Sequence, residues 1–190
     1  MMRKFLIAAA LLSAGAPAFA TDYQSSMQAY LESGAAAWTA EPSVVAAVAA
    51  ANEMSAGYSE AEIIAMDTAW RAEVGTADTA LVDSVLDNGT ADFLRQVVAD
   101  SGGIITEIIL MDAQGLNVAV SHVTSDYWQG DEAKHQETYG VGPDAVHFGD
   151  VELDESSQRY QGQISLTLVD PETGDAIGAV TIGVDAQALL

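Results

Sequence analysis

Residues Gln163–Leu189, QISLTLVDPETGDAIGAVTIGVDAQAL, contain two alternating patterns that are separated by a turn. Apolar side chains recur at every second position on both sides of the turn: Ile164, Leu166 and Leu168, then Val180, Ile182 and Val184. The run Asp-Pro-Glu-Thr-Gly at 170–174 is typical of a turn. The stretch therefore predicts two antiparallel strands, roughly 159–169 and 176–185, each with one face in a core.

Strand patterns continue upstream as far as Gly102-Gly103. The nearly continuous apolar run ITEIILMD (105–112) and the alternating run LNVAVSHV (116–123) flank a turn at Asp112–Gly115, which predicts a β-hairpin. Leu116, Val118 and Val120 are expected on one face of its second strand. A further strand is predicted over roughly 146–154.

Residues Asp22–Ser101 have a helical pattern, because they are rich in alanine and carry apolar residues at spacings of three and four. We expect one or two long N-terminal helices, followed by shorter helices near 78–87 and 90–101. The expected boundary signals are Pro42 in a first helical turn, a capping box from Ser59 to Glu62, a stop at Asn88-Gly89 and a cap at Thr90.

The order of elements indicates an α+β fold. An antiparallel five-stranded sheet with helices on one face and a crossover segment over the other accounts for that order most simply. No internal repeat or low-complexity linker is visible. We therefore expect one domain over 21–190, with a helical part at 22–101 and a sheet part at 104–190.

The N-terminus MMRKFLIAAALLSAGAPAFA has the pattern of a secretory signal peptide over residues 1–20. Arg3 and Lys4 precede an apolar run from Phe5 to Leu12, and the segment ends in an A-x-A cleavage site at Ala18–Ala20. The alternative, a membrane anchor, would need an apolar run of roughly 18 to 20 residues. The pattern favours a soluble, exported, periplasmic protein.

The chain of 190 residues is strongly acidic, with a formal net charge of −22. Removing Arg3 and Lys4 leaves four basic residues against 28 acidic ones, a formal net charge of −24. Such a charge repels phosphate backbones and anionic lipid heads, which argues against nucleic-acid and membrane-surface binding. Cysteine is absent, so disulfides, thiol chemistry and cysteine metal sites are excluded.

Catalytic motifs are missing from the sequence. There is no G-x-S-x-G elbow, and the three histidines are too widely spaced for a zinc motif, so we expect neither an enzyme, a cofactor nor a metal centre. Asp150, Glu152 and Asp154 would share one strand face. That arrangement fits either a hard-cation site or, as we favour, a half-solvated strand.

The segment SDYWQGDEAKHQETYG (125–140) predicts a loop with a short helix, and it concentrates aromatic and charged residues. Tyr127, Trp128 and Tyr139 have the large faces that line small-molecule pockets, and Asp126 or Asp131 could serve as counter-ion to an amine. The same aromatics could instead plug the open end of the sheet. Two basic residues of this half, Lys134 and Arg159, fit either contact with an anionic ligand or ion pairs with nearby carboxylates.

The runs ILMDAQGLNVAVSHVTSDYWQGDEAKHQETYG and QISLTLVDPETGDAIGAVTIGVDAQAL together resemble the single Cache (PDC, PAS-like) extracytoplasmic sensor domains of bacteria. The resemblance covers about 104–190 and implies a long N-terminal helix packed on the sheet. It also implies a ligand held between the other sheet face and residues 125–140, which would act as a lid. The contacts that it implies are Tyr127, Trp128, Asp131, Tyr139, His147, Arg159 and Asp185.

We therefore expect a non-catalytic periplasmic domain that binds an organic acid, an amino acid or an amine. Most Cache domains lie between two membrane helices, and none follows the last strand of this chain, so we expect signalling through a separate membrane receptor such as a histidine kinase. The alternative hypothesis is an acidic protein-interaction module without a small-molecule ligand.

Overall fold

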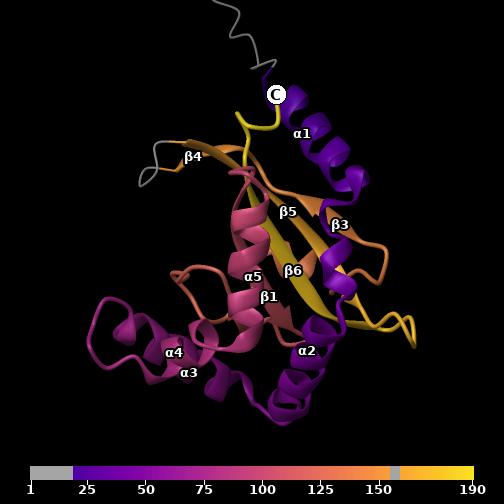
Figure 1. The fold of residues 1–190 in the computed structure, drawn as a ribbon. Helices are drawn as coiled ribbons and strands as arrows, with labels where there is room; N and C mark the ends of the chain where they lie inside the picture. Colours follow the sequence, from indigo (N-terminus) through magenta and orange to yellow (C-terminus); the bar gives the residue numbers. More distant parts are fainter. Residues whose placement is uncertain (1–18, 155–158) are drawn as a thin grey trace, which may run out of the picture.

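The computed structural model describes residues 19–154 and 159–190 (Figure 1). The signal peptide expected over residues 1–20 lies outside this part of the chain, except for its last two residues, which begin the first helix. In the part of the chain that the structure describes, no helix combines the length and the hydrophobicity that a bilayer crossing requires.

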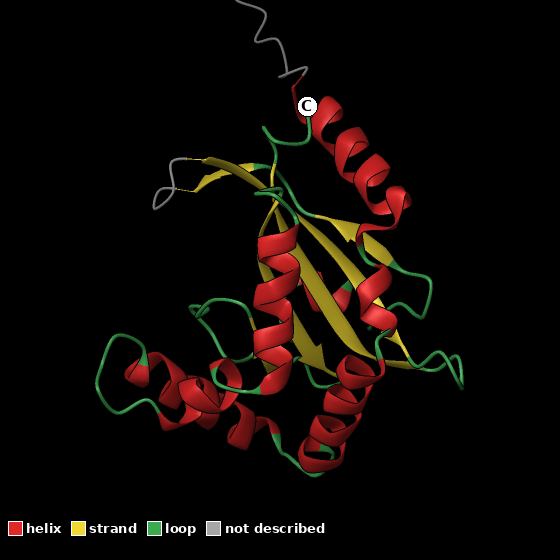
Figure 2. Ribbon diagram, viewed as in Figure 1, coloured by secondary structure: helices red, strands yellow, loops and turns green. Residues whose placement is uncertain are grey.

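Most of the helices precede the sheet in the sequence, and Figure 2 shows the helices in red beside the yellow strands. The helical elements that precede the sheet are α1 (Phe19–Tyr30), the π-helical turn η1 (Leu31–Ala35), the 3-10 turn η2 (Ala37–Ala40), α2 (Pro42–Ser55), α3 (Glu60–Glu73), α4 (Ala80–Leu86) and α5 (Gly89–Asp100), whereas α6 (Ala133–Gln136) lies between two strands. The N-terminal helical segment is interrupted, where the sequence suggested one or two long helices. Gly34 has a φ of +93°, outside the helical region, and Pro42 begins α2 at a position where its missing N–H costs nothing.

Two of the helix boundaries rest on side-chain caps. The predicted capping box is confirmed, since the Ser59 N–H donates to Glu62 Oε2 over 2.8 Å and the Ser59 hydroxyl accepts from the Glu62 N–H. The expected cap at Thr90 was wrong. Asn88 is the cap instead, because it has extended backbone angles and its side chain accepts from the Ala91 N–H over 2.8 Å. Helix α5 therefore begins at Gly89.

The strands form one antiparallel sheet in the order β2-β1-β6-β5-β3, with β4 also paired to β5. They are β1 (Ile105–Asp112), β2 (Asn117–Val120), β3 (Val146–Phe148), β4 (Glu152–Asp154), β5 (Arg159–Val169) and β6 (Ala176–Asp185). The α+β class with five strand positions is thereby confirmed. The strand expected over 146–154 is divided, because residues 149–151 leave the ladder after the Gly149 N–H donates to the Gln163 carbonyl over 2.8 Å.

One face of the sheet is covered by α1, α2 and α5, which lie in front of it in Figure 1. Its core comprises Met27, Val44, Val48, Leu94, Ile108, Leu110, Ile164, Leu168, Val180, Ile182 and Val184, all buried. The predicted alternation of the last two strands is confirmed, because these β5 and β6 side chains point toward the helices. We call the opposite side the lid face, since α6 of the 125–140 segment packs there against β5 and β6.

A second cluster occupies part of the lid face. Its buried members are Trp70, Val82, Val85, Ile109, Met111, Val120 and Ala179. The expectation that Leu116, Val118 and Val120 share one face was wrong. A bulge opposite Leu110 and Met111 leaves Val118 packed against the first cluster, whereas Val120 belongs to the second.

Candidate ligand-binding site

The lid face changes from apolar to polar along the strands. Met111 of β1 and Ala179 of β6 are paired at its apolar end, within the second cluster. Farther along, Glu107 of β1 is paired with Gly183 of β6, which in turn faces Gln163 of β5. Because side chains two residues apart share a sheet face, the strands bring a carboxylate and an amide to the polar end.

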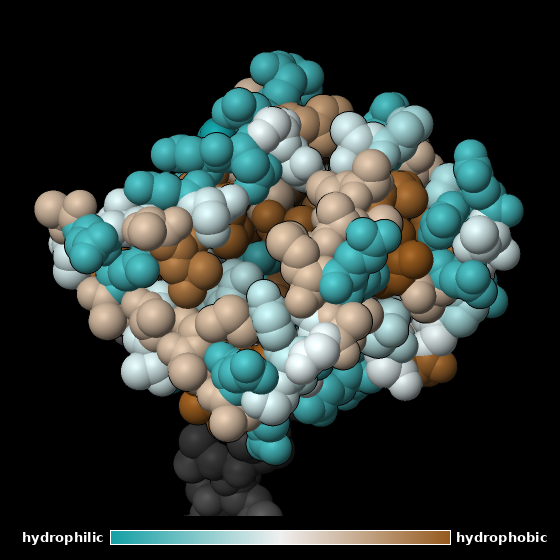
Figure 3. All heavy atoms as spheres, turned by 90° about the horizontal axis from the view of Figure 1, so that it is seen from below, coloured by the Kyte–Doolittle hydropathy of each residue, from teal (hydrophilic) through white to brown (hydrophobic). Residues whose placement is uncertain are grey.

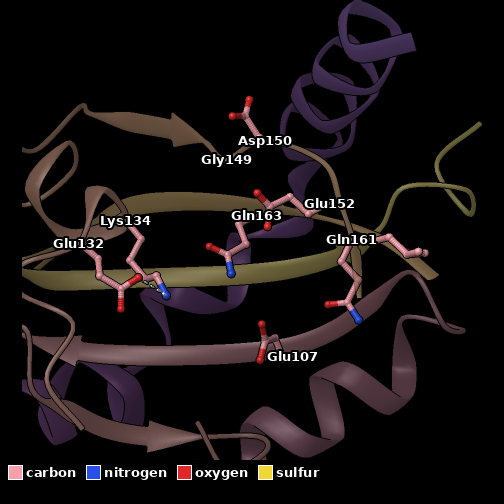
Figure 4. A pocket seen from close by; sticks show the side chains of 9 residues that line it. Glu107, Glu132, Lys134, Gly149, Asp150, Glu152, Gln161 and Gln163 are labelled. Atoms are coloured by element: carbon pink, nitrogen blue, oxygen red, sulfur yellow. Dashed lines mark ion pairs between the residues drawn. The ribbon is translucent and has the colours of Figure 1, made fainter. Parts of the chain in front are cut away.

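A cavity of about 520 Å³ lies over this polar end (Figure 4). Its lining residues are Glu107, Glu132, Lys134, Gly149, Asp150, Glu152, Leu153, Gln161 and Gln163. They come from three places: the strands β1 and β5, the lid segment, and the chain that runs from β3 into β4. The lining therefore holds four carboxylates and one ammonium, a formal charge of −3.

Gly183 gives the Glu107 side chain its place on the floor of the cavity. A Cβ atom at Gly183 would lie 2.6 Å from Glu107 Cγ and 2.8 Å from Thr106 Oγ1, closer than Cβ atoms approach other heavy atoms. Only glycine at this position lets the Glu107 side chain lie across the neighbouring strand.

Lys134 supplies the single ammonium of the lining, and it is already paired. Its Nζ lies 3.0 Å from Glu132 Oε2 and donates to Gln129 Oε1 over 3.0 Å, and its side chain is only 13% exposed. Both partners belong to the lid segment, so the ammonium is held by its own loop. Its charge is offset by Glu132, which leaves the carboxylates of Glu107, Asp150 and Glu152 to set the sign of the potential in the cavity.

The start of the lid segment is fixed to α3. The buried Asp67 carboxylate accepts hydrogen bonds from the backbone N–H groups of Tyr127, at 2.9 Å, and Trp128, at 3.1 Å. Arg71 bridges Asp67 at 2.6 Å and Asp126 at 2.7 Å. Asp126 is therefore engaged in an ion pair with α3.

The predicted aromatic residues lie outside the 520 Å³ cavity. The Tyr127 ring stacks on Trp70 at a centroid distance of 5.6 Å, and burial raises the pKa of its phenol to about 12. The Trp128 indole N–H donates to the Gln114 carbonyl over 2.9 Å. Tyr139 packs against the second cluster, with its ring 5.3 Å from that of His135. In these positions Tyr127 and Tyr139 cover the apolar end of the lid face.

The remaining predicted residues form ion pairs or face solvent. Arg159 Nη1 lies 2.8 Å from Oδ2 of the buried Asp185, beyond the polar end of the cavity. His147 Nδ1 lies 2.8 Å from Glu137 Oε2. Asp131 is exposed and is absent from the lining.

The structure thus brings Lys134 alone, among the nine predicted ligand contacts, into the lining of the cavity. Ligand contact by the other eight stays a prediction. Asp150 and Glu152, which the sequence suggested as neighbours on one strand, both line the cavity, although in the described residues no three acidic or histidine side chains are placed to hold a metal ion.

Sequence reasoning missed Glu107, Glu132, Gln161 and Gln163. The available signal for the two glutamines was the polar residues at odd positions of β5, opposite its apolar face, whereas Glu107 is a lone carboxylate inside a nearly continuous apolar run.

No family model matches the chain, and no curated protein matches it. Among solved structures, it is similar to the sensor domain of the V. cholerae histidine kinase DctB, with 14% identity, a TM-score of 0.39 and coverage of 90% of this chain and 58% of that chain. The sensory domain of the Campylobacter jejuni chemoreceptor Tlp3 shows 11% identity, a TM-score of 0.45 and coverage of 90% and 59%.

A third similar structure is the ligand-binding domain of the Pseudomonas aeruginosa PAO1 amino acid chemoreceptor PctC in complex with GABA. It shows 11% identity, a TM-score of 0.41 and coverage of 90% of this chain and 59% of that chain. This chain therefore spans less than two thirds of the length of these three sensor domains.

Proposed function

We propose that this chain is a periplasmic sensor domain without catalytic activity, which binds a small amine-bearing molecule in the 520 Å³ cavity. The single observation that carries the proposal is the lining of that cavity, where four carboxylates face one ammonium that is already paired. After removal of the leader, residues 21–190 would act as one domain that presents its bound form to a separate membrane receptor.

The charge of the lining selects among the ligand classes that the sequence left open. A dicarboxylate would have to enter a cavity with a formal charge of −3, in a protein of strongly negative net charge. An ammonium group would instead find carboxylates on both sides, from Glu107 of β1 and Glu152 of β4 (Figure 4). The side-chain amides of Gln161 and Gln163 can both donate and accept, so they suit a polar second end of the ligand.

The position of the cavity fits a sensing role. Its walls belong to separate parts of the chain, with Glu107 on the central sheet and Glu132 and Lys134 on the lid segment. A ligand that contacts both would hold the lid segment against the sheet. A ligand shifts a conformational equilibrium only if it binds one arrangement of the lid more tightly than another.

A thermal-shift panel tests the proposal. Useful probes are three compounds with carbon chains of similar length. 1,4-Diaminobutane carries two ammonium groups, GABA carries one ammonium and one carboxylate, and succinate carries two carboxylates. A ligand at 100 times its dissociation constant adds about 2.7 kcal/mol, which shifts the melting temperature of a domain of this size by several degrees. We expect stabilisation by the diamine, less by GABA and none by succinate. Stabilisation by succinate alone would contradict the proposal.

A further inference from the structure

Polar attachments hold the lid segment at its start, middle and end. Its start is bound by Asp67 of α3, at the end of the molecule where hydrophobic side chains are visible between hydrophilic ones (Figure 3). In its middle, His135 Nε2 lies 3.2 Å from the Asp112 carbonyl oxygen. Near its end, Glu137 Oε2 lies 2.8 Å from His147 Nδ1 of β3. Two of these three attachments use histidine, the side chain that ordinarily titrates near neutral pH.

His135 is the buried histidine of the pair. The residue is 7% exposed, and the centre of its ring lies 5.3 Å from that of Tyr139. Because a carbonyl oxygen can only accept, the bond to Asp112 places the proton of the neutral imidazole on Nε2. A second proton would go to Nδ1 and would put a positive charge inside the closed lid.

The strands beneath α6 give such a charge no counter-ion. Helix α6 packs on β5 and β6, whose paired lid-face positions are neutral: Gln163, Ser165, Thr167, Ala179, Thr181 and Gly183. The charged residues of these two strands are Arg159 and Asp185, which pair with each other at 2.8 Å beyond the polar end of the cavity.

The charged neighbours of His135 in the lid are already engaged. Lys134 pairs with Glu132 at 3.0 Å, and Glu137 pairs with His147. On the β1–β2 turn, the Asp112 carboxylate attracts a protonated ring, but it accepts from two backbone N–H groups of its own turn over 2.9 Å. Asp112 therefore offsets only part of the cost of burying the charge.

Burial is the largest influence on the ring, and it lowers the pKa of His135 below the ordinary value of 6.5. The hydrogen bond to the Asp112 carbonyl and the charge of Asp112 act in the opposite direction and are weaker. If the lid lifts, the ring reaches water and regains its ordinary affinity for a proton. Protons therefore bind the open lid more tightly than the closed lid, and acid shifts the equilibrium toward opening.

We propose that His135 makes the lid segment an acid-sensitive switch, which is closed at neutral pH and opens in mildly acidic solution. Glu132 and Lys134 line the 520 Å³ cavity and belong to the same segment, so opening removes one wall of the cavity. The switch is a property of the ligand-free chain, and only its effect on binding rests on the proposed function.

The direction of the pH dependence follows from the lowered pKa of His135. The closed lid is fully stable above about pH 6.5, and this stability is lost as the pH falls from there toward the lowered pKa. His147 acts in the opposite direction, because its pair with Glu137 is charged only when the imidazole is protonated. That pair contributes little, since the Glu137 side chain is 62% exposed.

Trypsin cleavage of the ligand-free protein tests the switch, because Lys134 places a cleavage site inside the lid. The rate of cleavage after Lys134 is divided by that of a peptide of residues 130–139 at the same pH, which corrects for the protease. We expect the corrected rate to rise about threefold or more between about pH 7.5 and about pH 5.5. Cleavage after Arg95, in α5, should not rise, which excludes global unfolding.

Two variants assign the effect. His135→Gln keeps an N–H donor but does not ionise, so it should abolish the acid-dependent rise. His122→Gln is the control, since His122 is exposed, and it should preserve the rise. No rise in the wild type, or an equal rise in His135→Gln, would overturn the proposal.

NMR titration of the His135 ring in the wild type needs no variant. The pKa of the ring should be below 6.5, because burial favours the neutral form. A pKa at or above 6.5 would overturn the proposal, since protonation would then not favour the open lid.

Calorimetric titration of 1,4-diaminobutane at the same two pH values separates the switch from the proposed function. The amines of the probe stay protonated throughout, since alkyl ammonium groups titrate at about pH 10. Affinity should be lower at about pH 5.5 in the wild type and nearly equal at both pH values in His135→Gln. Equal weakening in both proteins would contradict the role of His135. Acid-dependent cleavage without any diamine binding would support the switch and contradict the proposed function.

Discussion

The Asp67 carboxylate accepts a hydrogen bond from the backbone N–H of Tyr127 over 2.9 Å, and so joins α3 to the lid segment across 60 residues of sequence. The same oxygen also accepts from the Trp128 N–H at 3.1 Å, and the second carboxylate oxygen pairs with Arg71 at 2.6 Å. One buried side chain therefore fixes where the lid begins. The stability of the lid should depend on it.

Asp67→Ala should lower the free energy of unfolding by about 2–4 kcal/mol, because it leaves two backbone donors without their acceptor. Urea denaturation measures the change. Asp92→Ala is the matched control, since it removes an ion pair with Arg95 from an exposed helix surface and should cost less than about 1 kcal/mol. Equal losses in the two variants would show that Asp67 does not anchor the lid.

The phenol of Tyr127 should titrate late, with a pKa of about 12 against an ordinary value of 10.0. Burial is the main cause, and the nearby Asp112 and Tyr58 act in the same direction. Because the folded pKa is raised, the unfolded chain loses this proton first. The contribution of the neutral Tyr127 phenol to the stability of the fold is therefore complete below about pH 10. It is lost as the pH rises from about 10 to 12.

Absorbance titration of the wild type and Tyr127→Phe isolates this group. The difference between the two curves should show one phenol that ionises near pH 12, and unfolding should depend less steeply on pH in the variant above pH 10. A difference curve centred at pH 10 would mean that the Tyr127 phenol is exposed to solvent.

Gly183→Ala should disturb both the sheet and the cavity. The added Cβ atom would meet Glu107 Cγ at 2.6 Å, so the Glu107 side chain must leave the cavity floor. We expect a loss of about 1–3 kcal/mol in unfolding free energy and at least a tenfold loss in diamine affinity. Gly89→Ala, where nothing lies within 4 Å of the added atom, should leave both quantities nearly unchanged.

Replacement of Lys134 distinguishes the charge class of the ligand. Lys134→Met removes the only ammonium of the lining, so it should tighten binding of 1,4-diaminobutane severalfold. Arg95→Met changes the net charge equally but lies outside the lining, and it should have little effect. Calorimetric titration gives the dissociation constants. Loss of diamine binding in Lys134→Met would contradict the role given to the carboxylates.

Much of the fold followed from local patterns in the sequence. The alternation at Ile164, Leu166 and Leu168 predicted which face of β5 enters the core, and the capping box at Ser59 predicted where α3 begins. Features that depend on the conformation of a single residue were harder to predict. A single extra residue at Val118 moved a side chain to the other face, and the left-handed conformation of Gly34 interrupted a helical pattern that otherwise continues.

The candidate site was less predictable than the fold. Its lining joins Glu107 to Gln163 through the intervening strand β6, so it depends on the order of strands in the sheet, which no local pattern states. Tyr127 and Trp128 were predicted as ligand contacts because large aromatic faces commonly line pockets. Here Tyr127 stacks on Trp70 and the Trp128 N–H bonds to a carbonyl, so both help to hold the lid segment in place.

The most direct test of the central claim is calorimetric titration of 1,4-diaminobutane into the wild type, Glu107→Gln and Glu172→Gln. Glu107 lies on the cavity floor, whereas Glu172 lies in the exposed β5–β6 turn and gives the same change in net charge. We predict saturable binding to the wild type and Glu172→Gln, with an affinity at least tenfold weaker in Glu107→Gln, as expected for the loss of a charge-assisted hydrogen bond. Equal affinity in all three proteins, or no binding by the wild type, would contradict the account and favour an acidic protein-interaction module.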